Sequence, residues 1–247
     1  FNAHEYYPLE FEENKNWITY TKPYYNWILN NYFNKINLTF SVTASIGKMY
    51  EKEFKINWIE VTNATKYYEL KPVFNSRKIK LLHHGAALEG RRIEEMCELM
   101  ELLPDNYELN LMLVKTNNEY YNKLFSKYSS YNNINFIEPV EFSKIPEAIN
   151  KFDIGLYILK PNNFNEEHCL PNKFFEYIHA GLPVVVSKDL TYLAELVTTN
   201  RLGWVADSDS VLDLVANIGK SDICRYVENV QKYAKENLWS EEEKLFL

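Results

Sequence analysis

The sequence has few cysteines and glycines and no long apolar run. No stretch approaches the roughly 20 apolar residues that a membrane-spanning helix needs. The three cysteines, Cys97, Cys169 and Cys224, lie far apart and form no Cys-x-x-Cys pair, so neither a disulfide framework nor a zinc site is indicated. The seven glycines form no Gly-x-Gly-x-x-Gly motif, which argues against NAD and FAD as cofactors.

An excess of basic residues is also absent. Lys and Arg number 27 against 34 Asp and Glu, the net charge is −7, and the basic residues are dispersed. Nucleic acid is therefore not an expected partner, because phosphate backbones are bound by clustered positive charge. The chain begins at Phe1 without a signal-peptide pattern, and we expect it to be a piece of a longer cytoplasmic protein.

Strand and helix patterns alternate regularly from residue 78 to residue 220, which is typical of a doubly wound parallel α/β sheet. A last helix, at 221–238, precedes a helical tail. Strands are predicted at 78–84, 107–114, 134–137, 153–159, 184–186 and 202–206, and helices at 91–103, 118–131, 143–152 (with Ser143 as N-cap), 172–180, 190–200 and 211–218.

The first 75 residues are rich in Tyr, Trp and Asn and predict one smaller αβαβ unit. Its helices are expected at 12–34 and 46–54, and its strands at 38–42 and 58–61. Residues 63–76 show little periodicity and are predicted to be a linker between this unit and the main domain.

The run from His168 to Ser187 is the most informative segment. Its pattern predicts a loop, the start of a helix, a glycine that ends this helix and a buried strand. Pro171 and Asn172 begin the helix and Gly181 ends it. The free amides of a helix N-terminus favour an anion, Lys173 adds a positive charge, and Glu176 can accept hydrogen bonds from ribose hydroxyls. A carboxylate on a solvated helix surface is the alternative for Glu176.

A second candidate site follows the first strand of the main domain, in the segment from His83 to Glu95. Gly85 allows a phosphate to approach the backbone, and Arg91 or Arg92 could bind it bidentately at a helix start. The alternative is that both arginines are merely solvated. Strand alternation predicts that His83 points inward, which leaves His84 as the histidine of the cleft.

These two segments resemble the donor-binding half of GT-B glycosyltransferases of family 4, and the likeness extends over residues 78–245, including Trp239. Ala3-His-Glu-Tyr6 and residues 38–64 resemble parts of the family's acceptor domain. The resemblance implies a Rossmann-like donor domain at 77–247, a linker at 63–76, and the C-terminal remnant of an acceptor domain at 1–62.

The resemblance also implies roles for individual residues. Glu176 would hold the ribose, and Arg91 with the backbone of Asn172 and Lys173 would hold the diphosphate. His84 and Gly85 would belong to the same donor site. The remaining expected contacts are Pro139 and Val140 beside the base, His4 as a polar contact near the reacting sugar, and His168 near the transferred sugar.

The expected activity is transfer of a sugar, with retained configuration, from a nucleoside diphosphate to a hydroxyl acceptor in polysaccharide or glycoconjugate synthesis, without a metal. His168 stands where the family often has an acid, with Glu166 and Glu167 just upstream. A catalytically inactive nucleotide-sugar-binding module or partner subunit of another glycosyltransferase is therefore a second reading. A nucleotide-sugar epimerase of related architecture is a third.

An aromatic set in the N-terminal unit could form a membrane-interface face for a lipid-linked acceptor at the inner side of the membrane. No basic cluster accompanies it, so packing between helices is the expected role. The set comprises Trp17, Tyr20, Tyr24, Tyr25, Trp27, Tyr32 and Phe33.

Overall fold

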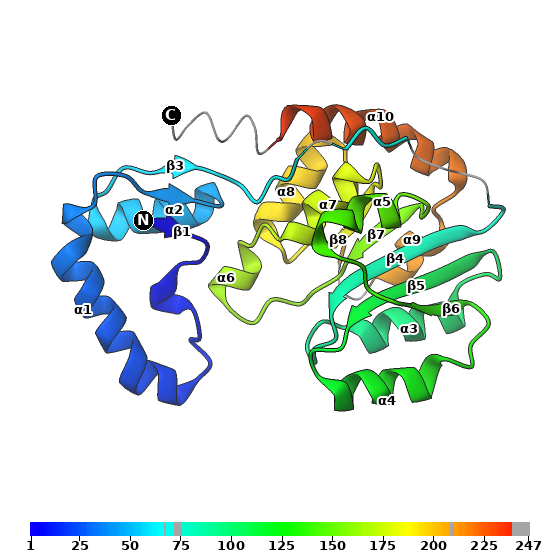
Figure 1. The fold of residues 1–247 in the computed structure, drawn as a ribbon, viewed down its shortest axis with the longest axis horizontal. Coiled ribbons are helices and arrows are strands. Elements are labelled where there is room, and N and C mark those ends of the chain that lie inside the picture. The colour runs from blue at the N-terminus through cyan, green and yellow to red at the C-terminus, as the bar shows by residue number, and fades with distance from the viewer. Residues whose placement is uncertain (67, 72–75, 208–209, 239–247) are drawn as a thin grey trace.

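The computed structural model describes residues 1–66, 68–71, 76–207 and 210–238. A six-stranded parallel sheet lies at the centre of the larger of its two parts (Figure 1). The strand order is β6-β5-β4-β7-β8-β9. The strands are β4 (Ile79–Ala86), β5 (Tyr107–Val114), β6 (Ile134–Ile137), β7 (Ile154–Tyr157), β8 (Val184–Ser187) and β9 (Gly203–Ala206).

Helices cover both faces of this sheet, so its strands are apolar on both sides (Figure 1). Neighbouring residues of one strand point to opposite cores: Leu81 packs in one and Leu82 in the other. The helices are α3 (Ile93–Leu102), α4 (Asn118–Tyr128) and α9 (Val211–Ala216) on one face, and α5 (Ile145–Ile149), α7 (Asn172–His179) and α8 (Thr191–Asn200) on the other.

The last described helix, α10 (Lys220–Glu236), contributes to both cores. Ile223 belongs to the core of α3 and α4, whereas Val230 and Ala234 belong to the core of α7 and α8. The predicted helical tail and Trp239 lie outside the described residues, as does part of the predicted linker.

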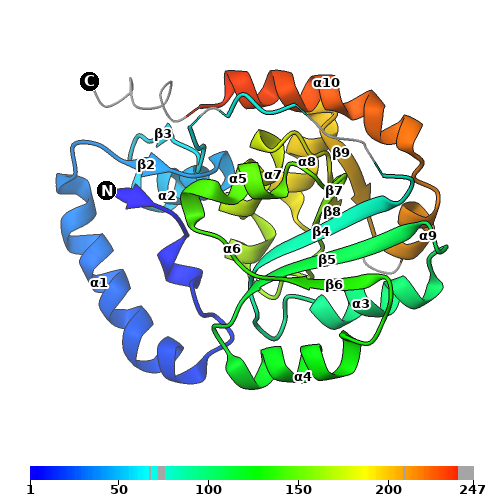
Figure 2. The ribbon, with the colours of Figure 1, turned by 45° about the vertical axis from the view of Figure 1, so that its right-hand side comes forward.

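A small three-stranded parallel sheet organises the N-terminal part, in the order β1-β2-β3 (Figure 2). Its own core surrounds the buried side chains of Tyr6, Phe33 and Tyr50. The elements are β1 (Asn2–Ala3), η1 (Tyr7–Leu9), η2 (Trp17–Thr21), α1 (Lys22–Tyr32), η3 (Phe33–Lys35), β2 (Phe40–Ser41), α2 (Ala44–Phe54) and β3 (Ile59–Glu60).

The predicted alternation of strands and helices is confirmed, with corrections at element ends. The single helix expected at 12–34 is divided into the π-helical turn η2, α1 and the short η3, and α4 ends at Tyr128 instead of 131. Ser143 caps no helix, because it lies inside the 3-10 turn η4 (Phe142–Lys144) that precedes α5.

The aromatic set of the N-terminal part is divided between core and surface. Trp17 and Phe33 are buried, as the packing interpretation predicted. That interpretation is wrong for Tyr20, Tyr24, Trp27 and Tyr32, which are exposed. Two of these exposed residues contact each other: the rings of Tyr24 and Trp27 stack with their centroids 6.4 Å apart.

Candidate functional site

The strand order reverses between β4 and β7, because the chain proceeds from β4 outward to β5 and β6 and then returns to continue through β7, β8 and β9. Ligands of open parallel sheets bind in the crevice beyond the carboxyl ends of the strands at such a reversal. Here that position is bounded by Gly85 and Ala86 at the end of β4 and by Tyr157 at the end of β7.

Gly85 and Lys173 meet at this crevice. Gly85 has a positive φ of 123°, and a Cβ atom placed on it would lie 3.0 Å from Nζ of Lys173. The missing side chain therefore leaves room for the ammonium group beside the end of β4. The same ammonium lies 5.3 Å from the ring centroid of Tyr157, within range of a cation–π contact.

Burial disfavours the charged forms of both Lys173 and Glu176. Burial, with a smaller effect from the nearby charge of Arg91, lowers the pKa of Lys173 to about 8. Burial raises the pKa of Glu176 to about 7, although the charge of Lys173 acts in the opposite direction. Glu176 is only 6% exposed, so it is not the solvated helix-surface carboxylate of the alternative interpretation.

His84 lies directly against Glu176, with 3.4 Å between Nε2 and Oε2. This pair is not an ion pair at neutral pH, because burial and then the charge of Lys173 lower the pKa of His84 to about 3. The expectation that only one of the two adjacent histidines points inward is wrong. Both His83 and His84 are buried, since helices cover both faces of the sheet.

The N-terminus of α7 lies at this crevice, because Lys173 in its first turn meets Gly85. Pro171 is the N-cap and offers no side-chain hydrogen bond, and the first turn contains no acidic residue. The amides of Asn172 and Lys173 precede the first intrahelical hydrogen bonds and are available to an anion. Gly181, with a φ of 82°, ends the helix as predicted.

Arg91 lies in the loop before α3 and not in its first turn, which corrects the expected helix start. Its side chain lines a cavity of about 470 Å³ together with Tyr157, Cys169 and Pro171. Arg92 has a different role: it is the left-handed N-cap of α3, and its guanidinium binds the carboxylate of Glu95.

The N-terminal part forms the other wall of this cavity, where His4, Glu5 and Glu10 line it. Asn165 of α6 (Phe164–Glu167) ties this wall to the larger part, since its Oδ1 accepts from the Tyr6 amide at 2.6 Å and its Nδ2 donates to the Tyr6 carbonyl at 3.2 Å. The cavity has the size of a small-molecule site, for which about 300 to 1,000 Å³ is usual.

His168 and Glu166 are placed differently with respect to the cavity. Glu166 lines it, and its Oε2 accepts a hydrogen bond from the Asn162 amide at 2.8 Å. The ring of His168 packs on Phe164 at 4.4 Å, and its Nε2 lies 4.0 Å from Oε1 of Glu167. His168 is not among the residues that line the cavity.

A neighbouring cavity of about 420 Å³ shares His4 and Asn63 with the first and is also lined by Asn172 and Phe142. Pro139 and Val140, the expected neighbours of the base, lie in the loop between β6 and η4 and line neither cavity. The structure thus brings together His84, Gly85, Lys173 and Glu176 at the crevice, and His4 with Arg91 in the larger cavity. It leaves Pro139, Val140 and His168 apart from them.

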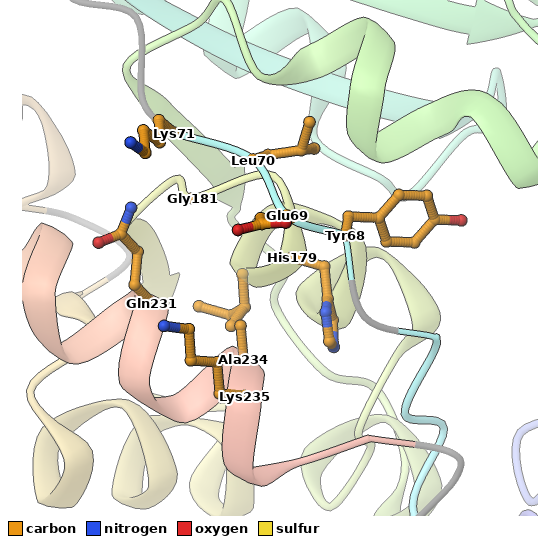
Figure 3. A pocket seen from close by; sticks show the side chains of 10 residues that line it. Tyr68, Glu69, Leu70, Lys71, His179, Gly181, Gln231, Ala234 and Lys235 are labelled. Atoms are coloured by element: carbon orange, nitrogen blue, oxygen red, sulfur yellow. The ribbon is translucent and has the colours of Figure 1, made fainter.

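A third cavity, of about 120 Å³, lies at the C-terminal end of α7 and is too small for a nucleoside diphosphate. Lys71, Gln231 and Lys235 surround it on one side, with Tyr68 on the other (Figure 3). His179 is buried beside it.

Several cavity residues escaped the sequence analysis. Tyr157 and Leu159 could have been found, because they lie near the end of a predicted buried strand at the sheet edge where ligands bind, and Cys169 lies in the run from His168 to Ser187. Glu5 and Glu10 carry no such signal, since only the folded chain brings them opposite Arg91. Over the described part of the chain, no three His, Cys, Asp or Glu side chains are grouped to hold a metal, and no helix is long and apolar enough to cross a bilayer.

A family model described as the glucosyltransferase 3-like C-terminal domain matches residues 105–238, more than half of the chain. No curated protein sequence matches this chain.

Solved structures of glycosyltransferases share the fold. Anabaena HepE with UDP is 11% identical over 96% of this chain and 67% of its own, with a TM-score of 0.75. A mutant of S. aureus TarM, with fondaparinux, α-GlcNAc-glycerol and UDP, is 13% identical over 90% of this chain and 45% of its own, with a TM-score of 0.69. The pneumococcal O-GlcNAc transferase GtfA, with UDP and GlcNAc, is 13% identical over 91% of this chain and 46% of its own, with a TM-score of 0.62. The chain spans less than half the length of TarM and GtfA. These likenesses confirm the predicted Rossmann-like domain of the GT-B fold.

Proposed function

This chain belongs to the family of glucosyltransferase 3-like C-terminal domains, and from that premise we propose that it binds a nucleoside-diphosphate sugar and serves in sugar transfer to a hydroxyl acceptor. One observation carries the proposal. Arg91, Lys173 and the N-terminus of α7 converge where the strand order reverses, beside a cavity large enough for a nucleotide sugar.

The positive groups suit the chemistry of the leaving diphosphate. When the bond between the sugar C1 and the phosphate oxygen breaks, negative charge grows on the diphosphate. The Arg91 guanidinium, the Lys173 ammonium and the amides at Asn172 and Lys173 would stabilise that charge without reorganisation. We propose that these groups take the place of a metal ion.

The remaining roles follow the resemblance to family 4. Glu176 would accept hydrogen bonds from the ribose, and Pro139 and Val140 would flank the base after a movement of their exposed loop. His4 would contact the reacting sugar from the N-terminal wall, where it shares the cavity with Arg91. We propose retention of the anomeric configuration, a role in polysaccharide or glycoconjugate synthesis, and a cytoplasmic location consistent with three free cysteines.

Glu166 favours an active site over an inactive binding module. The inactive reading rests on His168, which stands where the family often has an acid. In the folded chain Glu166, two residues earlier, supplies a carboxylate to the cavity that contains Arg91. We infer that Glu166 takes the place of the acid that the family often has at the position of His168.

Calorimetry with UDP, GDP and their glucose conjugates, with and without EDTA, tests the binding proposal. UDP is the first choice because it is present in the TarM, GtfA and HepE structures. We expect R91A and E176Q each to weaken binding by about 1 to 3 kcal/mol, as for lost charge-assisted hydrogen bonds.

R92A is the matched control. It removes the same charge from the next residue, whose side chain binds Glu95. Equal affinities of R91A and R92A would contradict the site. Sugar transfer is tested separately, by following nucleoside diphosphate release and glycan product with candidate hydroxyl acceptors. Release without a glycan product would indicate hydrolysis alone.

A further inference from the structure

The pairing between β4 and β7 is short. Only Leu81 with Ile154 and Leu82 with Gly155 are in register, although β4 continues to Ala86 and β7 to Tyr157. Beyond these pairs the two strands separate, and their backbone groups need other partners because the region is buried.

The hydroxyl of Tyr177 occupies this opening. It accepts a hydrogen bond from the His84 amide at 3.3 Å, and it lies 3.2 Å from the carbonyl oxygen of Leu156 and 3.4 Å from that of Leu82, to which it can donate. One side chain of α7 thus connects the diverging ends of both strands. His83 Nδ1 reaches the same Leu156 carbonyl at 3.2 Å and adds a second link between β4 and β7.

Gly155 makes room for this arrangement. A Cβ atom on Gly155 would lie 2.4 Å from Cγ of Tyr177, so any side chain there would displace the ring. The ring also meets His84 edge to face, with centroids 4.8 Å apart. Tyr177 is completely buried and lines none of the three cavities described above.

We propose that Tyr177 is a positioning residue for the nucleotide site, because its hydroxyl fixes α7 against the ends of β4 and β7. The adjacent Glu176 and the nearby Lys173 come from α7, whereas His84 and Gly85 come from β4. The hydroxyl therefore sets the separation between the two halves of the crevice. The nucleotide part of this inference rests on the proposed function.

The test compares Y177F with Y107F. Tyr107 is also a buried tyrosine whose hydroxyl donates to backbone carbonyls, those of Val215 at 2.9 Å and Ile218 at 2.6 Å, but it lies at the opposite end of the sheet, at the start of β5. Both variants lose the same chemical group, so both should lower the melting temperature. Only Y177F should lower UDP affinity, by about five- to tenfold, because only this hydroxyl holds the site residues of α7 against those of β4.

Hydrogen exchange in the nucleotide-free proteins gives a second readout that does not depend on the ligand. The amide hydrogen of His84 should exchange faster in Y177F than in the wild type, because this variant removes its acceptor. In Y107F its exchange rate should not change. Unchanged exchange at His84, or equal UDP affinity of Y177F and wild type, would overturn the positioning role. Absence of any nucleotide binding by the wild type would instead overturn the proposed function, and faster exchange in Y177F would still support the link between helix and strands.

Discussion

Glu176 and Lys173 lie three residues apart on α7, and burial brings the pKa values of both toward neutrality. Such pKa shifts are common at functional sites, because burial and neighbouring charges there match the pKa of a group to its task. Here the task would be to present a carboxylate to ribose hydroxyls and an ammonium to a diphosphate. The two pKa values define a narrow pH range in which both groups are charged.

We therefore expect UDP affinity to be greatest between about pH 7 and pH 8. Below that range Glu176 takes up a proton and becomes a weaker acceptor, and above it Lys173 loses its proton and its charge. Each limb should cost about tenfold in affinity, as for one charge-assisted hydrogen bond. Calorimetry at pH 6, 7.5 and 9 measures both limbs.

Two variants assign the limbs. K173M should bind weakly and show no fall at high pH. E176Q should lose most of the fall at low pH, keeping only what the terminal phosphate of UDP contributes near its own pKa of about 6. Its high-pH limb should move to lower pH, because the charge of Glu176 supports the protonated lysine. A pH profile of E176Q identical to that of the wild type would contradict these assignments.

At the scale of the elements, α7 depends on a glycine in a neighbouring strand. Gly155 of β7 faces the ring of Tyr177 so closely that an added methyl group must move the ring or the strand. We expect G155A to lower the free energy of unfolding by about 1 to 3 kcal/mol, the usual cost of overpacking a core. Urea unfolding measures this loss.

G219A is the control for this prediction. A Cβ atom on Gly219 would lie 3.3 Å from the side-chain oxygen of Asp222, which can move, and the residue precedes α10 with an ordinary φ of −98°. Gly219 is the N-cap of α10, where alanine is less favourable than glycine, so the effect of G219A should stay below about 1 kcal/mol. If G155A is as stable as G219A, the close packing of α7 on β7 is not a constraint.

The sequence was sufficient to predict α7, because its ends carry local signals: Pro171 at the start and Gly181 after the end. It was misleading for α5, where Ser143 looked like an N-cap, whereas the helix begins at Ile145, with Pro146 in its first turn, after a 3-10 turn. It was silent about α6, whose four residues are too few for a periodic pattern. Local signals define long elements, and short ones depend on tertiary contacts.

At the scale of the whole molecule, Asn165 joins the two parts of the chain. Its amide group makes two hydrogen bonds to the backbone of Tyr6, 159 residues away, and both residues are buried. N165A should cost about 1 to 3 kcal/mol, because the Tyr6 amide would lose its partner inside the protein. Faster hydrogen exchange at Tyr6, together with a lower urea midpoint, would show it.

N229A provides the comparison. Asn229 is only partly buried and donates one solvent-exposed hydrogen bond, to the Arg201 carbonyl at 3.3 Å. Its loss should change stability by less than about 0.5 kcal/mol, as is usual for surface positions. Equal effects of N165A and N229A would mean that the contact with Tyr6 does not hold the cavity wall in place.

The arrangement of the whole molecule explains which site residues were predictable. Gly85, Lys173 and Glu176 belong to motifs that the topology of a parallel sheet brings to one edge, so their meeting follows from strand order. The burial of His84 depends on helices covering both faces, and Glu166 enters the cavity only through the fold of α6. Neither property is encoded in the spacing of nearby residues.

The link through Tyr177 also has a consequence for the order of folding. The pairing of β4 with β5 joins residues 28 positions apart, from Ile79 to Tyr107, whereas Tyr177 reaches the His84 amide across 93 residues. Contacts distant in sequence form late, because a longer loop must close first. During synthesis the edge of β4 that faces β7 is therefore completed at His84 only after α7 has left the ribosome, and until then this edge can pair with other chains.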